Sequence, residues 1–348
     1  MTSQRKQKWL WVDSDAGVDD AVALCAALKL QKEWGYRCKG ISTSFGNTSA
    51  ENVNVNVRKV MASCVKDGAG ECPIHAGAVG GLKGETADAS YFHGKDGLGD
   101  AGLEDPVEMA LDERGAVEGL IGVGEEAKRE GAELVVVTIG PLTNLAQAMM
   151  EGGGGGWMGG VERLVVMGGC GNAHGNATRV AEFNVKADVT AAAHVFEHWR
   201  GQMTVVSWDL CCGNPIPWRA FHEAVSKEHH EGEVGRFLKA ICRDIYSSEK
   251  DADKRSGEGA VICDFLAVAC AIDRAVVRGR EMVNVEVETG GGITEGMTVV
   301  DWGCYDGVEG REKSVEWVKE LDMEKAIEML GATVRGGVGG VECNTREV

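Results

Sequence analysis

The sequence lacks the features of several classes of protein. No apolar run approaches the length of a membrane-spanning helix, and residues 1–15 contain no apolar signal-peptide core. Basic residues are few: 36 Lys and Arg stand against 54 Asp and Glu, so the formal charge is −18. Nucleic acids and anionic membranes require a basic surface, so we expect neither as a partner.

The twelve cysteines form no C-x-x-C pair and show no zinc-ligand spacing. A chain of 348 residues that is 44% hydrophobic can bury a large core without disulfides, so we expect reduced thiols and a cytoplasmic protein. No Pro- or Ser-rich linker divides the chain. We therefore predict one large domain over residues 1–330 and a Gly-rich tail over residues 331–348.

Apolar runs and helical periodicity alternate along the chain. The predicted strands are Trp9–Val12, Lys39–Ser44, Glu133–Ile139, Arg163–Met167 and Met203–Ser207, with a late hairpin at Val283–Glu288 and Met297–Asp301. The predicted helices cover about 21–30, 50–63, 116–129, 142–150, 187–198 and 321–330. This alternation predicts an α/β fold with a Rossmann-like open sheet, mostly parallel but mixed, and helices on both faces.

An acidic turn follows the first strand. In D-x-D-x-G-x-D-D its carboxylates are Asp13, Asp15, Asp19 and Asp20. Ligands bind at the carboxyl ends of strands in open α/β sheets. Four carboxylates so close together repel one another and resist burial unless a cation, protons or solvent offsets the cost. Oxygen ligands favour a hard cation, Ca²⁺ or Mg²⁺.

Other interpretations of this turn fit less well. A solvated turn that caps a helix explains one or two Asp residues but not the full run. An EF-hand loop starting at Asp13 requires Glu at its twelfth position, where Leu24 stands. The aspartyl-phosphate phosphatases carry Thr or Val where this chain has Gly17.

The acidic run resembles the signature of the nucleoside hydrolases, the inosine–uridine-preferring family. Later segments resemble other motifs of that family, in the expected order: FGN at 45–47, HGKDGLG at 93–99, GPLTN at 140–144 and AEFN at 181–184. The resemblance extends from about Trp9 to Asp301. It implies hydrolysis of the N-glycosidic bond of ribonucleosides to ribose and free base, with one Ca²⁺ in the site.

The resemblance also implies the ligands of the cation. They are Asp15, Asp20, Asp264 and the main-chain carbonyl of Ile139. Asp264 lies in the otherwise apolar run 261–272, where an unpaired buried charge is costly and a metal partner is favoured. Asp15 would be the general base for a metal-activated water, and Asp13 would support the loop. In GPLTN, we expect Thr143 or Asn144 to cap the following helix.

A further set is expected to hold the nucleoside. For the ribose and the site around it the residues are Asp19, Asn47, Met167, Asn176, Glu182, Asn184 and Asp264. Tyr246 and Arg255, in a polar segment before Asp264, are candidate contacts to the base. Taken alone, Asn47 fits a turn residue, and Glu182 and Asn184 fit helix caps; these alternatives stay open.

The catalytic candidates are Asp15, His93 and Cys263. His93 would donate a hydrogen bond or a proton to the leaving base, because its pKa is ordinarily near neutrality. Cys263 departs from the His or Trp of the family's motif; a thiol with a pKa near ~8.5 is a weak donor. Cys263 also fits a small buried residue, so base preference does not follow from the resemblance.

Two other functions compete with the nucleoside hydrolase. A phosphatase-type metal hydrolase is disfavoured because no Lys/Arg cluster or P-loop accompanies the acidic turn. A catalytically weak nucleoside-binding protein would keep the same polar set. For any of these we expect a small-molecule ligand and a homo-oligomer, a dimer or a tetramer.

Overall fold

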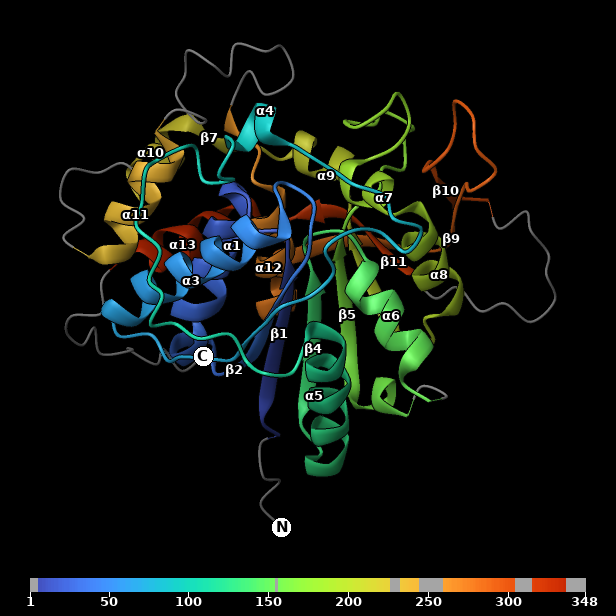
Figure 1. Ribbon diagram of the computed structural model, residues 1–348. Helices are drawn as coiled ribbons and strands as arrows, with labels where there is room; N and C mark the ends of the chain where they lie inside the picture. Colours follow the sequence, from blue (N-terminus) through green and yellow to red (C-terminus); the bar gives the residue numbers. More distant parts are fainter. Residues whose placement is uncertain (1–5, 154–155, 226–231, 244–258, 304–314, 336–348) are drawn as a thin grey trace, which may run out of the picture.

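The protein is described from a computed structural model over residues 6–153, 156–225, 232–243, 259–303 and 315–335. A nine-stranded sheet lies between two layers of helices (Figure 1). Six of its seven parallel strands, β3-β2-β1-β4-β5-β6, follow the Rossmann order, and β11 extends the parallel part. At that end β9 pairs antiparallel with β11, and β10 pairs antiparallel with β9. The predicted α/β fold with a mostly parallel, mixed sheet is confirmed.

The sheet order is β10-β9-β11-β6-β5-β4-β1-β2-β3. Its strands are β1 (Lys8–Ser14), β2 (Arg37–Thr43), β3 (Ile74–His75), β4 (Glu133–Thr138), β5 (Val161–Met167), β6 (Gln202–Val206), β9 (Val277–Val287), β10 (Thr298–Asp301) and β11 (Val315–Leu321). β7 (Ile216–Pro217) and β8 (Gly259–Ala260) form a separate two-stranded sheet.

Alternate side chains of the strands supply two separate cores. In β1, Leu10 and Val12 pack into one core, whereas Trp9 and Trp11 pack into the other. The helices of the first core are α1 (Val18–Lys29), α3 (Ala50–Lys66), α10 (Trp218–Val225), α11 (Glu233–Cys242), α12 (Cys263–Ile272) and α13 (Met323–Val334). Those of the second are α5 (Ala116–Glu130), α6 (Thr143–Glu151) and α8 (Val189–His198).

Short helices occupy the connections. They are α2 (Gln31–Trp34), α4 (Ser90–His93), α7 (Phe183–Ala187) and α9 (Trp208–Gly213), with 3₁₀ turns at Trp157–Gly160 and Arg274–Val276. Helix α13 continues to Val334, so the first residues of the expected tail are helical. None of the helices in the described ranges is long and apolar enough to cross a membrane.

The strand order also fixes where a ligand can bind. From β1 the chain continues to β2, which pairs with one edge of β1, while β4 pairs with its other edge. Parallel strands that diverge in this way leave a crevice at their carboxyl ends. Asp13 and Ser14 end β1 at that edge, beside Thr138 of β4 and Thr43 of β2.

Candidate active site

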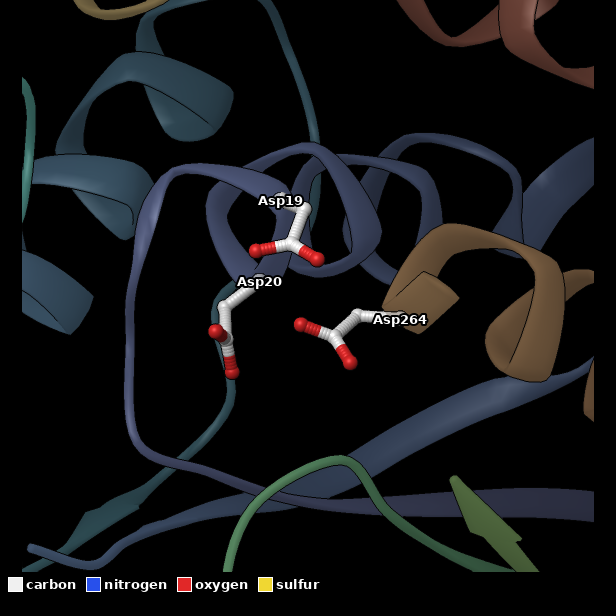
Figure 2. Close-up of side chains that lie close together, drawn as sticks. All are labelled: Asp19, Asp20 and Asp264. Carbon is white, nitrogen blue, oxygen red and sulfur yellow. The ribbon is translucent and has the colours of Figure 1, made fainter. Parts of the chain in front are cut away.

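Three carboxylates meet where the N-terminal ends of α1 and α12 come together. Asp19 and Asp20 lie in the first turn of α1, and Asp264 lies in the first turn of α12. One oxygen from each lies within 4.8 Å of the others, and Figure 2 shows the side chains facing a common space. Asp20 and Asp264 are buried, whereas the Asp19 side chain keeps 15% of its surface exposed. Such a set suits a bound cation.

Asp15 lies beside this group and is fully buried. Its Oδ2 accepts a hydrogen bond from the backbone N–H of Asn47 at 2.9 Å, and its Oδ1 accepts one from Asn47 Nδ2 at 3.0 Å. The same Nδ2 donates to Asp20 Oδ2 at 2.9 Å. A single amide therefore connects Asp15 to Asp20, one of the three carboxylates at the helix ends.

The turn between β1 and α1 is closely packed around Asp20. Ser14 Oγ donates to Asp20 Oδ1 at 2.7 Å, and the Gly17 N–H donates to Oδ2 at 2.9 Å. Ala16 adopts a φ of 40°, which is unfavourable for a residue with a Cβ. A Cβ on Gly17 would lie 2.6 Å from both Asn47 Nδ2 and His93 Nδ1, so only glycine fits there.

Asp13, near the end of β1, supports the turn that follows. Its Oδ1 accepts hydrogen bonds from Ser42 Oγ and from Asn144 Nδ2, the latter at 2.7 Å. Its buried Oδ2 has no hydrogen-bond partner within the described residues. Burial raises the pKa of Asp13 to about 6. Asn144 also donates to the Thr43 carbonyl at 2.8 Å, so it joins the ends of β1 and β2.

The expectation that Thr143 or Asn144 caps α6 is wrong. That helix begins after Leu142 with no side-chain cap. Thr143 Oγ1 donates to Asp188 Oδ2 at 2.8 Å instead, and Asn144 faces Asp13. A sequence cannot separate these roles, because an N-cap and a partner for a strand-end carboxylate require the same side-chain types.

Burial shapes the electrostatics of the whole cluster. It raises the pKa of Asp19 to about 7, and it raises those of Asp15 and Asp264 well above their ordinary value, with further contributions from the neighbouring carboxylates. Within the described ranges no Lys or Arg forms an ion pair with any of the three. Protons or a bound cation must therefore balance their charge.

The donor set fits a hard divalent cation. Oxygens of Asp19, Asp20 and Asp264 converge, and carboxylate oxygen is the ligand that such cations prefer. The Ile139 carbonyl oxygen accepts a hydrogen bond from Asn184 Nδ2 at 3.3 Å, and the next residue, Gly140, lies against Asp15. The converging group contains Asp19, which we had assigned to the sugar, and does not include Asp15.

The AEFN segment holds Glu182 and Asn184 against the residues that end β4 and β5. Glu182 caps α7: Oε1 accepts from the Asn184 N–H, and Oε2 accepts from Gly169 N–H at 2.9 Å. Asn184 Nδ2 also donates to the Met167 carbonyl, so it joins the ends of β4 and β5. Asn176 Oδ1 accepts from the Phe183 N–H at 2.8 Å. Glu182 is therefore a helix cap, and this role leaves a sugar contact open.

His93 lies on the side of α1. Its Nδ1 accepts a hydrogen bond from the Val18 N–H at 3.0 Å, so the ring proton of the neutral imidazole is on Nε2. Burial lowers the pKa of His93 to about 3. His93 is thus a neutral hydrogen-bond donor, rather than the titrating acid that its ordinary pKa had suggested.

The remaining candidates lie near the start of α12 or outside the described residues. Cys263 is buried beside Cys211, and the contact of the two thiols together with burial raises its pKa well above the ordinary value. Tyr246 and Arg255 lie outside the described residues. Ser14, Ser42 and Asn144 were not predicted as parts of the site. Ser14 is next to Asp13 and Asp15 in the sequence, whereas only the fold places Ser42 and Asn144 beside Asp13.

Comparisons with known proteins identify the family. The model of the family described as inosine-uridine preferring nucleoside hydrolase matches residues 10–328. An inosine-uridine preferring nucleoside hydrolase of Leishmania major is 34% identical over 298 residues, which cover 84% of this chain and 87% of that protein. A probable uridine nucleosidase 2 of Oryza sativa subsp. japonica is 35% identical over 186 residues, 53% of this chain and 52% of that relative.

Solved structures share the fold. The structure of an inosine-guanosine nucleoside hydrolase superposes with a TM-score of 0.82 at 25% identity, over 94% of this chain and 98% of that one. The likeness thus extends over nearly the whole fold.

Proposed function

We propose a catalytic mechanism from the premise that this chain belongs to the inosine-uridine preferring nucleoside hydrolase family, whose model covers residues 10–328. The chain is a nucleoside N-ribohydrolase, which splits ribonucleosides into ribose and free base. The observation that carries the mechanism is the meeting of buried carboxylates, without a basic partner among the described residues, at the crevice of the sheet. Such a cluster suits a cation and a cationic sugar better than a phosphate.

We infer that the cation is Ca²⁺ and that Asp15, Asp20, Asp264 and the Ile139 carbonyl hold it. When bound, a divalent cation supplies positive charge that anchors vicinal hydroxyls and acidifies water. Oxygen-only ligands from several loops are typical of calcium sites. Asp19, which converges with Asp20 and Asp264, would then face both the cation and the ribose.

Asp15 is proposed as the general base. Its two oxygens are oriented by Asn47, and its burial favours acceptance of a proton from an attacking water. Cleavage of the N-glycosidic bond gives the ribose oxocarbenium character. The surrounding carboxylates stabilise that positive charge in a site with little water.

Polar groups in and near the AEFN segment, residues 181–184, are proposed to position the ribose. Asn176, Glu182 and Asn184, together with Met167, would contact the ribose along with Asp19. Fixed hydrogen bonds to the sugar hydroxyls convert binding energy into a lower barrier. For Asn184 this role is compatible with its contacts to the ends of β4 and β5, which hold the side chain rigidly.

The two groups proposed to lie near the leaving base, His93 and Cys263, are weak acids. Neutral His93 donates a hydrogen bond from Nε2, and the buried thiol of Cys263 stays protonated at neutral pH. Neither group is a strong proton donor. We infer that most of the catalytic power comes from stabilisation of the sugar cation rather than from protonation of the base.

Location and assembly are also proposals. The acidic composition and the twelve thiols without C-x-x-C spacing favour the cytoplasm. We infer a homo-oligomer, because compact enzymes of this size commonly form closed symmetric assemblies. Size-exclusion chromatography with light scattering tests the assembly; a mass of one chain contradicts it.

The direct test is an assay of reducing-sugar release from purine and pyrimidine nucleosides, with and without a chelator. We expect release from at least one nucleoside, loss with the chelator and recovery with Ca²⁺. Asp15→Ala should lower the rate about 10³-fold. The matched control is Asp105→Ala, which removes a surface carboxylate paired with Arg58. Near-normal turnover by Asp15→Ala excludes Asp15 as the base, and chelator-resistant turnover excludes the cation.

A further inference from the structure

Four cysteines gather at the edge of the sheet that ends in β3. Cys25 is in α1, Cys38 in β2 and Cys64 in α3, and all three are buried. Cys72, between α3 and β3, is partly exposed. The Sγ atoms of Cys38 and Cys72 lie 3.5 Å apart. The catalytic mechanism uses none of these thiols.

A metal site does not fit this cluster. Structural zinc requires three or four ligand atoms around one point. Among the described side chains, only the carboxylates of Asp19, Asp20 and Asp264 form a group of three whose ligand atoms lie within 4.8 Å of one another. The chemistry open to the cysteines is therefore pairwise, and the closest measured pair is Cys38 and Cys72.

We propose that Cys38 and Cys72 form a disulfide that fastens the β3 edge of the sheet under oxidising conditions. The sulfur atoms are in contact and need to approach by only ~1.5 Å to reach bonding distance. Cys38 is fixed in β2, while Cys72 precedes Pro73 in a connecting segment. The proposal does not depend on the catalytic mechanism.

The bond would act on a weakly held part of the fold. β3 has two residues, Ile74 and His75, which pair with Ile41 and Ser42 of β2. A disulfide between Cys38 and Cys72 encloses residues 38–72, including α3. Closing a loop of that length removes conformational freedom from the unfolded chain and so stabilises the fold.

The same edge is connected to the catalytic site. Past β3, the Gly77 N–H donates to Thr43 Oγ1, and the Ala78 N–H donates to Asn144 Oδ1 at 2.9 Å. Asn144 in turn contacts Asp13. Because the bond leaves this arrangement in place, it should add stability without changing the hydrolysis rate.

The oxidation can be written with a small disulfide such as oxidised glutathione. The Cys72 thiolate attacks it and forms a mixed disulfide, releasing one glutathione thiolate. The Cys38 thiolate then attacks the Cys72 sulfur and releases the second glutathione. Two electrons pass to the oxidant and both thiol protons pass to solvent. The hydrogen bond with Cys38, together with burial, raises the pKa of Cys72, so the reaction should accelerate as pH rises.

The test treats the full-length protein with oxidised glutathione, quenches it with acid and maps peptic peptides by mass spectrometry. We expect one linked pair, Cys38 with Cys72, and a loss of two titratable thiols. The thermal midpoint should rise by about 5 °C, and dithiothreitol should reverse the rise. The hydrolysis rate should stay the same.

Cys72→Ser is the principal variant, because its partly exposed site tolerates serine. It should lose the linked peptide and the thermal shift. The matched control is Cys212→Ser, another partly exposed cysteine, which should keep both. The proposal is overturned by a glutathione adduct on Cys72 that never resolves, by linkage of a different pair, or by an equal thermal shift in Cys72→Ser.

Discussion

Asn47 holds Asp15 through two hydrogen bonds, one from its backbone N–H to Oδ2 at 2.9 Å and one from its side-chain amide to Oδ1 at 3.0 Å. The side-chain amide also donates to Asp20. These contacts fix two carboxylates that would otherwise repel each other. The loop after β2 therefore organises an acidic cluster whose members come from the turn before α1, from α1 itself and from α12.

Asn47→Ala should weaken both metal affinity and hydrolysis by about 10–100-fold, as expected when a residue that orients metal ligands is removed. Calcium titration and initial rates measure the two effects. The control is Asn52→Ala, which removes an amide that contacts Thr48 and the Lys95 carbonyl instead. If Asn47→Ala behaves like that control, the orienting role is wrong.

His93→Ala should lower stability by about 1–3 kcal/mol, because the buried Val18 N–H loses its acceptor. The alkaline limb of the kcat/KM profile, where a required acid would lose its proton, should keep its position, since the pKa of His93 is lowered to about 3 and the ring does not titrate near neutrality. Thermal unfolding and pH–rate profiles test this. His198→Ala, at an exposed position on α8, serves as the control. Disappearance of the alkaline limb in His93→Ala would show that the ring is a titrating acid.

The chelator-treated protein should lose stability as pH rises. The pKa values of Asp13 and Asp19 increase on folding, from 3.8 to about 6 and about 7. The folded state then holds more protons, so their contribution is present below pH ~4 and is lost as pH rises through 6 to 7. The lowered pKa of His93 acts in the opposite direction, between its usual 6.5 and about 3.

A comparison of the calcium-bound and calcium-free protein separates the contribution of the carboxylates to stability from that of His93. Binding requires the ionised carboxylates, whereas the His93 contribution is common to both forms and cancels in their difference. The rise in thermal midpoint on adding Ca²⁺ should therefore increase from pH 5 to pH 7.5. Scanning calorimetry of the two forms measures it, and a pH-independent rise would contradict the account.

Much of the architecture follows from local pattern. Strand-length apolar runs and helical periodicity predicted β1, β2, β4, β5 and β6 and the helices between them, because period and length are properties of short segments. Helices α10 and α11 were not predicted. The late hairpin was located, but β9 begins at Val277, earlier than its apolar run indicates.

The sequence predicted which acidic residues form the site better than it predicted the contacts that those residues make. The acidic run places Asp13, Asp15, Asp19 and Asp20 at a strand end from the sequence alone. That Asn144 contacts Asp13, across a separation of 131 residues, depends on how β1, β2 and α6 pack. The neutral state of His93 likewise depends on burial, which no local motif encodes.

The measurement closest to the central claim is isothermal titration calorimetry of Ca²⁺ into protein freed of metal by a chelator and dialysis. The account predicts saturable binding of a single ion per chain, loss of that binding in Asp264→Asn, and normal binding in Asp105→Asn, with all three proteins folded by circular dichroism. Absence of saturable binding to the unmodified protein, or equal affinity in Asp264→Asn, would contradict it.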